Sequence, residues 1–407
     1  MSGRCRGVAR GRALTAAGAL AAAGALAACS SAPSAAPGGS SATAPGVTPV
    51  SMATSVGAGA DTWAVVPMSA DPAFWEVLVR SGNSASWKLV TPPGVADNGG
   101  LVVSPGGENS LTVAVRPSQD LVFSPLAATA NGGASWSAGP PLEAAVAASP
   151  DAFAADGAKL AALLTDGAVE TSADAGSSWS VIAKPGAIAA SAAGKGCGGA
   201  VRVTSVSFGP ATISFGPGTV RVASTDVLAG GTCGNGGAAA MFSYSPGTGW
   251  QRVSLPVSGQ LVRLSGVLAL VQGTSGLSAL WRGAGEYGSV INSTSASTPQ
   301  PAPTNWSTSA TLPASGQVIA SGTLASDGAW VLLSGGQAAT IGGPGQQWTL
   351  LPPAPAKTTV LAAGPDGSTD ALAVSGATLT VWRLAPKAVV WQKVQAISVP
   401  VQAGSSG

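Results

Sequence analysis

The sequence predicts an all-β chain folded as a seven-bladed β-propeller of four-stranded antiparallel blades. Gly and Pro, 57 and 30 of the 407 residues, recur at short intervals among Val, Thr and Ser, a composition typical of short strands joined by tight turns. Trp recurs seven times at the end of a turn-like segment. The spacing of these seven tryptophans is close to the length of one propeller blade.

Successive marker tryptophans lie 49, 43, 71, 56, 42 and 43 residues apart. A four-stranded blade takes about 40 to 50 residues, so four intervals fit bare blades and two predict insertions. We therefore expect a propeller over residues 50–400. The alternative with the same number of strands is a pair of β-sandwich domains, which the regular period and the lack of an internal linker disfavour. The markers are Trp87, Trp136, Trp179, Trp250, Trp306, Trp348 and Trp391.

Three of the markers close an eight-residue motif of the form S/T-x-D-x-G-x-x-W, with Asp, Asn or Ser in the third place. A side-chain oxygen at that place can accept backbone N–H groups across a hairpin turn, and Gly supplies the positive φ that the turn needs. The motif therefore predicts the turn before the outermost strand of a blade. Its positions are Thr129, Asn131, Gly133 and Trp136; Ser172, Asp174, Gly176 and Trp179; and Ser243, Ser245, Gly247 and Trp250.

This motif resembles the Asp-box, or BNR, repeat of sialidase-like β-propellers, and the likeness covers nearly all of the chain beyond the first 49 residues. The resemblance implies that the turns are structural, so Asp174 is not expected to be a catalytic acid. Sialidases of that family also use three Arg, a Tyr nucleophile paired with Glu, and an Asp. Here Tyr244 falls in a motif turn, and Glu286 would point away from Tyr287 on a strand. The family's Arg-Ile-Pro signature is also missing, so the resemblance implies the fold without its catalytic set.

Sequence around two of the markers predicts four strands in each repeat. In the last repeat the strands are expected at 358–363, 370–375, 378–384 and 390–397. In the second repeat they are expected at 101–104, 111–115, 121–124 and from Trp136 onward. Asp-Gly pairs such as those at 156–157, 166–167 and 366–367 supply the turn signals between strands.

Residues 1–28 have the features of a bacterial export signal: four Arg without an acid, then a short Ala- and Leu-rich stretch. The stretch ends in Leu-Ala-Ala-Cys29, which resembles the lipobox of bacterial lipoproteins. The resemblance implies diacylglycerol on Cys29, cleavage before it and acylation of the new amine, which together hold a protein stably on a membrane. We expect a lipid-anchored protein on the outer face of the cell membrane, with a disordered, uncharged tether over 29–49 and a tail over 401–407.

The remaining cysteines suit an exported protein. Cys5 leaves with the leader, so Cys197 and Cys233 are expected to form one disulfide in Gly-rich sequence within the longest interval. The segments 185–199 and 225–237, joined by this bond, and the polar, Pro-rich segment 283–305 are the candidate contact loops.

The composition excludes several kinds of chemistry. Without His there is no Ser-His-Asp triad and no His-ligated zinc, and we expect neither metal nor cofactor. Without the four leader arginines, the chain has 15 basic and 17 acidic residues. This nearly neutral net charge argues against nucleic-acid binding.

We therefore predict a monomeric binding or scaffold propeller for an envelope protein or a cell-wall glycan. A role as an assembly factor for a membrane complex is also consistent with the sequence, which does not distinguish it from a binding or scaffold role. The alternative is a carboxylate-based glycan hydrolase of sialidase-like fold. A hydrolase would gather two or more acids within about 10 Å at the mouth of the central channel, whereas a scaffold would place small and apolar residues there.

Overall fold

The computed structural model divides the chain into two compact units, Met1–Gly46 and Val47–Gly407. The first unit lies wholly outside the residues that the structure describes, as do the expected signal peptide 1–28, Cys29, the tether 29–49, the segment 283–305 and the tail 401–407. The described residues are 52–55, 61–68, 75–82, 84–93, 101–107, 109–115, 122–147, 149, 151–198, 200–209, 212–215, 218–221, 226–234, 237–266, 268–282, 306–313, 316–324 and 328–399.

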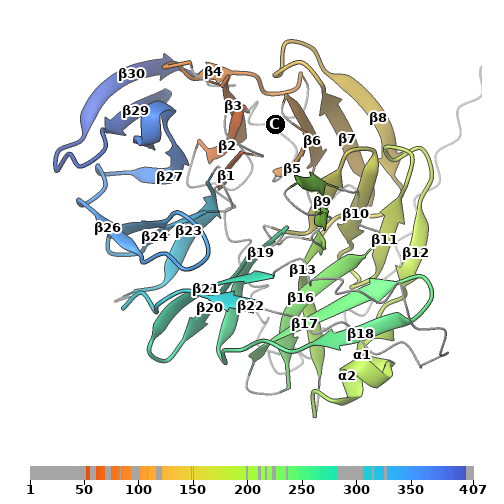
Figure 1. Cartoon of the computed structure of the whole chain (residues 1–407). Helices are drawn as coiled ribbons and strands as arrows, with labels where there is room; N and C mark the ends of the chain where they lie inside the picture. Colours follow the sequence, from red (N-terminus) through yellow and green to blue (C-terminus); the bar gives the residue numbers. More distant parts are fainter. Residues whose placement is uncertain are drawn as a thin grey trace, which may run out of the picture. The chain divides into compact units, whose positions relative to one another are not determined.

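The second unit is the predicted seven-bladed β-propeller. Seven four-stranded antiparallel sheets are arranged in a ring, and in each sheet hydrogen-bonded neighbours follow chain order (Figure 1). The first strand of each blade lies toward the middle of the ring and the last toward its rim, most clearly in the sheets labelled β5 to β8 and β9 to β12 (Figure 1). The prediction of the fold class is confirmed.

The first four blades are built as follows. Blade 1 contains β1 (Met52–Ser55), β2 (Thr62–Pro67), β3 (Trp75–Arg80) and β4 (Lys88–Leu89). Blade 2 contains β5 (Leu101–Gly107), β6 (Ser110–Val115), β7 (Ser124–Thr129) and β8 (Ser137–Leu142). Blade 3 contains β9 (Phe153–Asp156), β10 (Lys159–Leu163), β11 (Val169–Ser172) and β12 (Ser180–Ala183). Blade 4 contains β13 (Val201–Phe208), β16 (Val227–Cys233), β17 (Ala238–Ser245) and β18 (Gly249–Val253).

The last three blades follow the same plan. Blade 5 contains β19 (Gln260–Ser265), β20 (Leu268–Gly273), β21 (Gly276–Arg282) and β22 (Trp306–Thr308). Blade 6 contains β23 (Val318–Thr323), β24 (Ala329–Leu333), β25 (Ala338–Ile341) and β26 (Thr349–Leu351). Blade 7 contains β27 (Thr358–Ala363), β28 (Thr369–Ser375), β29 (Thr378–Leu384) and β30 (Gln392–Ser398), with a 3-10 turn, η2 (Pro365–Gly367), after β27.

The order of the strands within a blade explains their composition. A second strand such as β24, Ala-Trp-Val-Leu-Leu, is buried at every position because both faces of its sheet pack on neighbouring blades. The outermost strand β30 has only partly buried or exposed residues, since one edge and much of its surface meet solvent. Uniformly apolar runs therefore mark the inside of a blade and polar runs mark its rim.

The hydrophobic core is divided into clusters that lie between blades. One cluster joins apolar side chains of blades 1 and 2, and another joins those of blades 5 and 6. A larger cluster contains buried side chains of blades 6 and 7 together with Leu78 and Trp87 of blade 1. Blades 1 and 7 have no strand in common, because each forms its own four-stranded sheet. The ring is therefore closed by the packing of side chains in this cluster.

The structure corrects three details of the sequence prediction. The third strand of the second repeat begins at Ser124 and runs to Thr129, whereas it was expected at 121–124. The apolar pair Val122 and Phe123 misled that prediction, because Val122 is 79% exposed and pairing with the neighbouring strands begins after Phe123.

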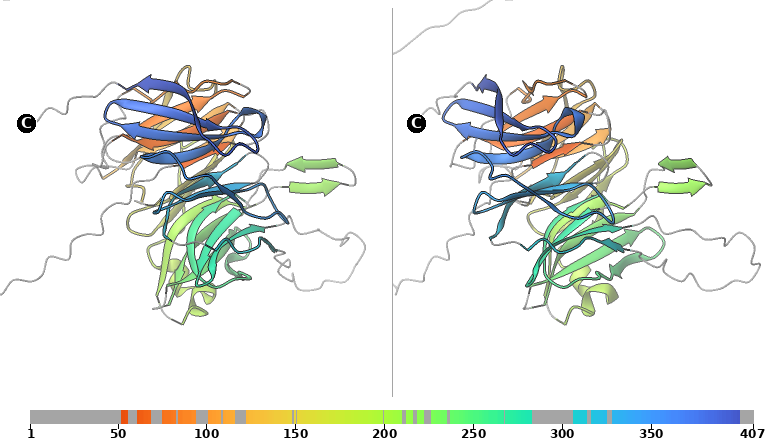
Figure 2. Two further views of the ribbon diagram at one scale, coloured as in Figure 1. Left: turned by 90° about the vertical axis from the view of Figure 1, so that its left-hand side faces the viewer. Right: turned by 60° about the vertical axis from the view of Figure 1, so that its left-hand side comes forward.

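The other two corrections concern the longest interval. Neither segment expected as a contact loop is one throughout: 185–199 contains two single-turn helices, α1 (Ala187–Ala190) and α2 (Ala192–Lys195). Segment 225–237 is mostly the blade strand β16, whose residues pair with β13 and β17. Between β13 and β16 the chain forms an additional hairpin, β14 (Thr212–Phe215) and β15 (Gly218–Arg221), whose strands pair only with each other. The hairpin stands apart from the blade sheets in both views of Figure 2.

Within the described residues, no helix has the length and apolar character needed to cross a lipid bilayer.

Candidate functional site

The turns of the propeller open on two faces. In an antiparallel blade the chain reverses direction at each turn, so turns alternate between the faces. The turns before the second and fourth strands open on one face, called here the marker face, because the marker motifs occupy the turns before the fourth strand. The turns before the third strand, and the connections between blades, open on the opposite face, called here the connection face.

The full copy of the motif makes a turn closed by side-chain hydrogen bonds. Asp174 Oδ1 accepts from the Ser178 backbone N–H at 2.9 Å and from the Ser172 hydroxyl at 2.7 Å. Ser172 Oγ accepts from the Gly176 N–H at 2.8 Å. Hydrogen bonds from Ser178 and Ser172 lower the pKa of Asp174 to about 2. The carboxylate is therefore occupied by its own turn, as expected for a structural residue.

The copy with Asn has the same geometry. Asn131 Oδ1 accepts from the Ser135 N–H at 3.0 Å, and Thr129 Oγ1 accepts from the Gly133 N–H at 3.0 Å. Gly133 has a φ of 78°, and a Cβ there would lie 2.6 Å from Val90 Cβ of blade 1. Glycine is needed at this position both for the turn and for the close approach of the neighbouring blade.

The copy with Ser differs. The Ser245 hydroxyl donates to Asp226 on the segment leading into β16, not to its own turn. Its turn is closed by the backbone bond from Thr248 N to Ser245 O, at 3.1 Å. A serine side chain is shorter than Asp or Asn by one group, which accounts for the missing bonds across the turn. Gly247, the motif glycine here, has open space where a Cβ would stand. Contrary to the prediction it does not have a positive φ, which in this turn is found at Gly249, with a φ of 68°.

The marker indoles recur at one place, the start of the outermost strand, and most of them reach the preceding blade. Trp136 Nε1 donates to Val90 O at 2.8 Å, and Trp250 Nε1 donates to Ile182 O at 3.1 Å. The same bond to the preceding blade is made by Trp306 to Ser254 O, Trp348 to Ser309 Oγ and Trp391 to Pro352 O. Trp179 is the exception, since its N–H donates to Gly176 O in its own turn.

Trp87, the first marker, makes its bond to the last blade. Its Nε1 donates to Asp370 Oδ2 at 2.9 Å. Asp370 is fully buried and also accepts from Arg383 at 2.6 and 2.9 Å, while Arg80 Nε lies 3.7 Å away. The hydrogen bonds that Arg383 donates to Asp370 raise the pKa of Arg383, and burial lowers the pKa of Arg80. These four residues are called here the closure cluster, because they join blades 1 and 7.

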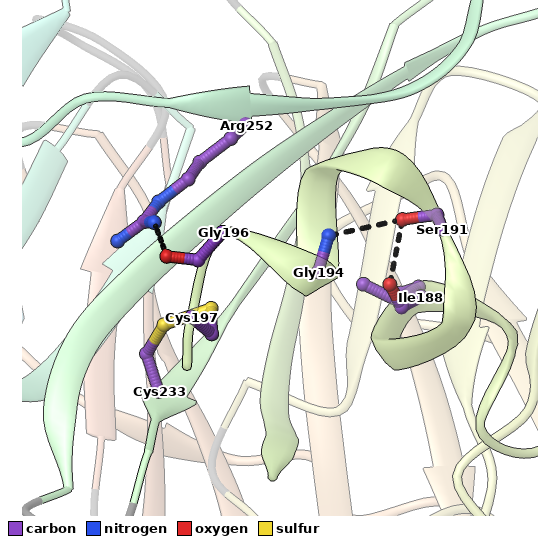
Figure 3. Close-up of a disulfide and its surroundings, with 7 residues drawn as sticks. All are labelled: Ile188, Ser191, Gly194, Gly196, Cys197, Cys233 and Arg252. Carbon is purple, nitrogen blue, oxygen red and sulfur yellow. Dashed lines mark hydrogen bonds between the residues drawn. A yellow bond between two sulfur atoms is a disulfide. The ribbon is translucent and has the colours of Figure 1, made fainter. Parts of the chain in front are cut away.

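Cys197 and Cys233 form the predicted disulfide, which fastens the long connection between blades 3 and 4 (Figure 3). The bond links the end of this connection to the last residue of β16. Arg252 Nη1 on β18 donates to Gly196 O at 2.6 Å, next to the disulfide. The connection is therefore fixed to blade 4 by one covalent bond and one charge-assisted hydrogen bond.

The two short helices of the connection are joined by Ser191. Its Oγ accepts from the Gly194 N–H at 3.1 Å and donates to Ile188 O at 2.6 Å (Figure 3). Ile188 is 4% exposed and belongs to the core cluster of blades 2, 3 and 4. The connection thus packs on the blades as a fixed wall.

A cavity of about 470 Å³ opens on the connection face beside this wall. It lies between blades 3 and 4, and its size is within the range of small-ligand sites. Its apolar residues include the buried Leu163 and Ile188. Its polar residues include Ser149, Asp166, Arg202 and Thr204.

The carboxylate of Asp151, just before β9, contacts the first strand of blade 5, β19. Asp151 lies 3.3 Å from Arg263 Nη2 and accepts from the Leu264 N–H at 2.9 Å. Arg263 also donates to Ser321 O of blade 6 at 2.7 Å. Burial raises the pKa of Asp151, and Arg263 and the Leu264 N–H act against that rise. Arg263 is the one charged group among the described residues that affects this pKa.

In the part of the chain that the structure describes, no three His, Cys, Asp or Glu side chains are grouped so that they could hold a metal ion.

The chain matches no protein-family model and no curated protein. Among solved structures it is similar to YCF48 from Cyanidioschyzon merolae, with 13% identity and a TM-score of 0.44 over 84% of this chain and 97% of that one. It is similar to a GH74 xyloglucanase from Xanthomonas campestris, with 14% identity and a TM-score of 0.47 over 82% of this chain and 52% of that one. A lectin from Aleuria aurantia in complex with α-methyl-L-fucoside is 12% identical, with a TM-score of 0.39 over 87% and 96% of the two chains.

Sequence reasoning found the disulfide and the connection that it fastens, but it missed the residues around them. Ser149, Asp166 and Arg202 come from three separate parts of the chain. Asp166 was interpreted only as a turn residue, and its Oδ1 does accept from the Ala168 N–H at 2.8 Å. No local pattern marks these residues as neighbours, because it is the packing of two blades that brings them together.

Proposed function

We propose that this protein is a propeller that binds an envelope protein or a cell-wall glycan. We also propose that acyl groups on Cys29 hold it on the outer face of the cell membrane. The observation that supports binding most is the cavity beside the fixed connection. The connection between blades 3 and 4 is fastened at both its helices and its end. A wall fixed in this way presents its surface without an ordering cost on binding, which favours affinity.

The alternative, a glycan hydrolase, has less support. Such an enzyme needs one carboxylic acid as proton donor and a second carboxylate as nucleophile or base. Asp151, just before the innermost strand β9, is buried and engaged by Arg263 and a backbone N–H. Asp174 is committed to its own turn. Neither is free to take part in proton transfer.

The proposal is tested by cross-linking in the native envelope. The full chain is expressed with a photo-reactive amino acid at Thr204, in the cavity, and in a second strain at Lys393, on the exposed rim of blade 7. We expect one discrete adduct from the Thr204 position and none from the Lys393 position. Digestion with a protease or with a cell-wall hydrolase then shows whether the adduct is a protein or a glycan. Equal labelling from both positions, or none from either, would contradict a specific binding role.

A further inference from the structure

We infer that the rim of blades 6 and 7 lies on the surface of a phospholipid bilayer and inserts two valines among the lipid headgroups. The inference rests on the proposed attachment to a membrane and adds which side of the propeller meets the lipid. This surface is called here the rim patch, and it consists of Leu350, Lys387, Val389, Val390 and Lys393.

The apolar part of the rim patch is centred on the turn before β30. Val389 and Val390 are 78% and 66% exposed, and Leu350 on the edge strand β26 of the neighbouring blade is 56% exposed. Leu350 and Val389 line the same surface depression, so the aliphatic side chains of the two blades lie together. Aliphatic groups left in water forgo the free energy of burial, and a cluster of them on a surface indicates a contact site.

The marker motif shows that the turn of blade 7 differs from its counterparts. The two positions before the marker Trp are Ser177 and Ser178 in blade 3, and Gln346 and Gln347 in blade 6, and all four are exposed. Among the described marker turns, that of blade 7 alone has two branched aliphatic residues there. The fold does not require them, because the other blades form the same turn with polar or small residues at these positions.

The charged part of the rim patch is positive. Lys387 and Lys393 are exposed, and within the described residues neither forms an ion pair. Asp366, in the neighbouring turn, and the buried Asp370 balance the two guanidinium groups of the closure cluster. The two lysines therefore give this rim a net positive charge beside its valines. A bilayer suits this combination, because lysines can meet lipid phosphates while aliphatic side chains reach the acyl boundary.

Two further arguments favour a bilayer over a protein partner. Three aliphatic side chains are far fewer than the about 20 to 30 residues that each side of a stable protein interface uses. A bilayer contact needs less area if the protein is already tethered, because the contact is then intramolecular. The expected tether over 29–49 is short, since a flexible chain of about 20 residues spans about 25 Å on average. It leads to β1, which packs beside β23 and β27 of blades 6 and 7.

The experiment places a fluorescent probe in the turn and leaves the valines intact. Ala385→Cys is labelled with a nitrobenzoxadiazole dye in the full-length chain, which is reconstituted in phosphatidylcholine vesicles with and without phosphatidylglycerol. Ala173→Cys is the matched control, because Ala173 is an exposed alanine at the same motif position in blade 3. The wild type should not be labelled, since the other cysteines of the exported chain are expected to be acylated or in the disulfide.

We expect spin-labelled lipid in vesicles with phosphatidylglycerol to quench the probe at Ala385 at least about twofold more than the probe at Ala173. Val389→Ser/Val390→Ser introduces the residues of the blade 3 turn and should remove this difference. Its thermal midpoint should not fall, because both valines are exposed. Lys387→Gln/Lys393→Gln should remove the part of the quenching that depends on phosphatidylglycerol.

Equal quenching of the two probes in vesicles that carry the chain would overturn the inference and leave the anchor on Cys29 standing. A chain that does not float with neutral vesicles refutes the anchor, and the same two probes then test the rim patch on anionic vesicles. A dimer in detergent that the double serine variant abolishes, without lipid quenching at Ala385, would assign the rim patch to a second copy and overturn the inference. Cross-linking from Lys393 in the envelope would attach lipid alone, so the test for a protein or glycan partner is unaffected.

Discussion

Asp370 is a buried carboxylate at the junction of the first and last blades. It is 0% exposed and receives hydrogen bonds from Arg383 and from the Trp87 indole, with Arg80 close by. A buried carboxylate between two guanidinium groups is favourable only while every partner is in place, because each charge has lost its hydration. Its removal leaves uncompensated positive charge at the junction of the first and last blades.

We predict that Asp370→Asn lowers the free energy of unfolding by about 3 to 5 kcal/mol, the cost of breaking a buried ion pair. Chemical unfolding followed by Trp fluorescence measures the change. Asp366→Asn is the matched control, since Asp366 is an exposed turn residue on the same blade and should change stability by less than about 0.5 kcal/mol. Similar losses in both variants would show that Asp370 has no special role.

A second residue-scale prediction concerns Asp174 and pH. The folded-state pKa of Asp174 is lowered to about 2 by hydrogen bonds from Ser178 and Ser172, whereas the unfolded chain has an ordinary carboxyl pKa near 3.8. A lowered folded pKa means that the contribution to stability is present above the unfolded pKa and is lost as pH falls toward about 2. Titration by carbon NMR of the Asp174 carboxyl should give this pKa.

Asp174→Asn provides the comparison. Asn131 holds the equivalent turn of the preceding blade with the same hydrogen-bond pattern, so the variant should fold normally at neutral pH. Its stability should then fall less than that of the wild type between pH 4 and pH 2. An Asp174 pKa near 3.8 in the folded protein would refute the assignment of the turn bonds.

At the scale of elements, the connection between blades 3 and 4 depends on its disulfide. Closing a loop with a sequence separation of 36 residues restricts the unfolded chain by about 4 kcal/mol in the chain-entropy view. Cys197→Ser should therefore lower the thermal midpoint and leave Cys233 reactive toward a thiol probe under denaturing conditions. The Cys197→Ser/Cys233→Ser variant should have the same lowered midpoint without the reactive thiol. Full labelling of Cys233 in the unreduced wild type would contradict the disulfide.

The sequence predicted some elements well because their signals are local. The last repeat was expected at 358–363, 370–375, 378–384 and 390–397, and its strands lie within two residues of these bounds. Asp-Gly and Gly-Ala turns fix those ends. The helices α1 and α2 were missed because four-residue turns rich in Ala and Gly have no periodic apolar pattern to detect.

Contacts between blades could not be predicted. Trp87 and Asp370 are separated by 283 positions, and nothing in their local sequence indicates that they meet. The cavity has the same origin, since Ser149, Asp166 and Arg202 stand in different segments of blades 3 and 4. The marker tryptophans predicted how many blades there are, but the side chains that seal one blade to another depend on the closed ring.

At the scale of the whole molecule, the proposed location depends on Cys29. Three acyl chains would bury enough CH₂ groups, at about 0.8 kcal/mol each, to hold the protein on a membrane. Cys29→Ala should move the protein from the membrane fraction to the soluble fraction of the envelope, with an unchanged thermal midpoint of the propeller. Unchanged retention in the membrane fraction after a high-salt wash would refute the lipid anchor.

In the whole molecule, side chains of the first and last blades contact each other and close the ring. The most direct test is the coupling free energy between Trp87 and Asp370, measured by unfolding of Trp87→Phe, Asp370→Asn and the double variant. Since the indole N–H donates to the Asp370 carboxylate, we predict a coupling of about 1 kcal/mol or more, although 283 positions separate the two residues. Additive effects within about 0.3 kcal/mol would mean that blades 1 and 7 do not meet at this junction.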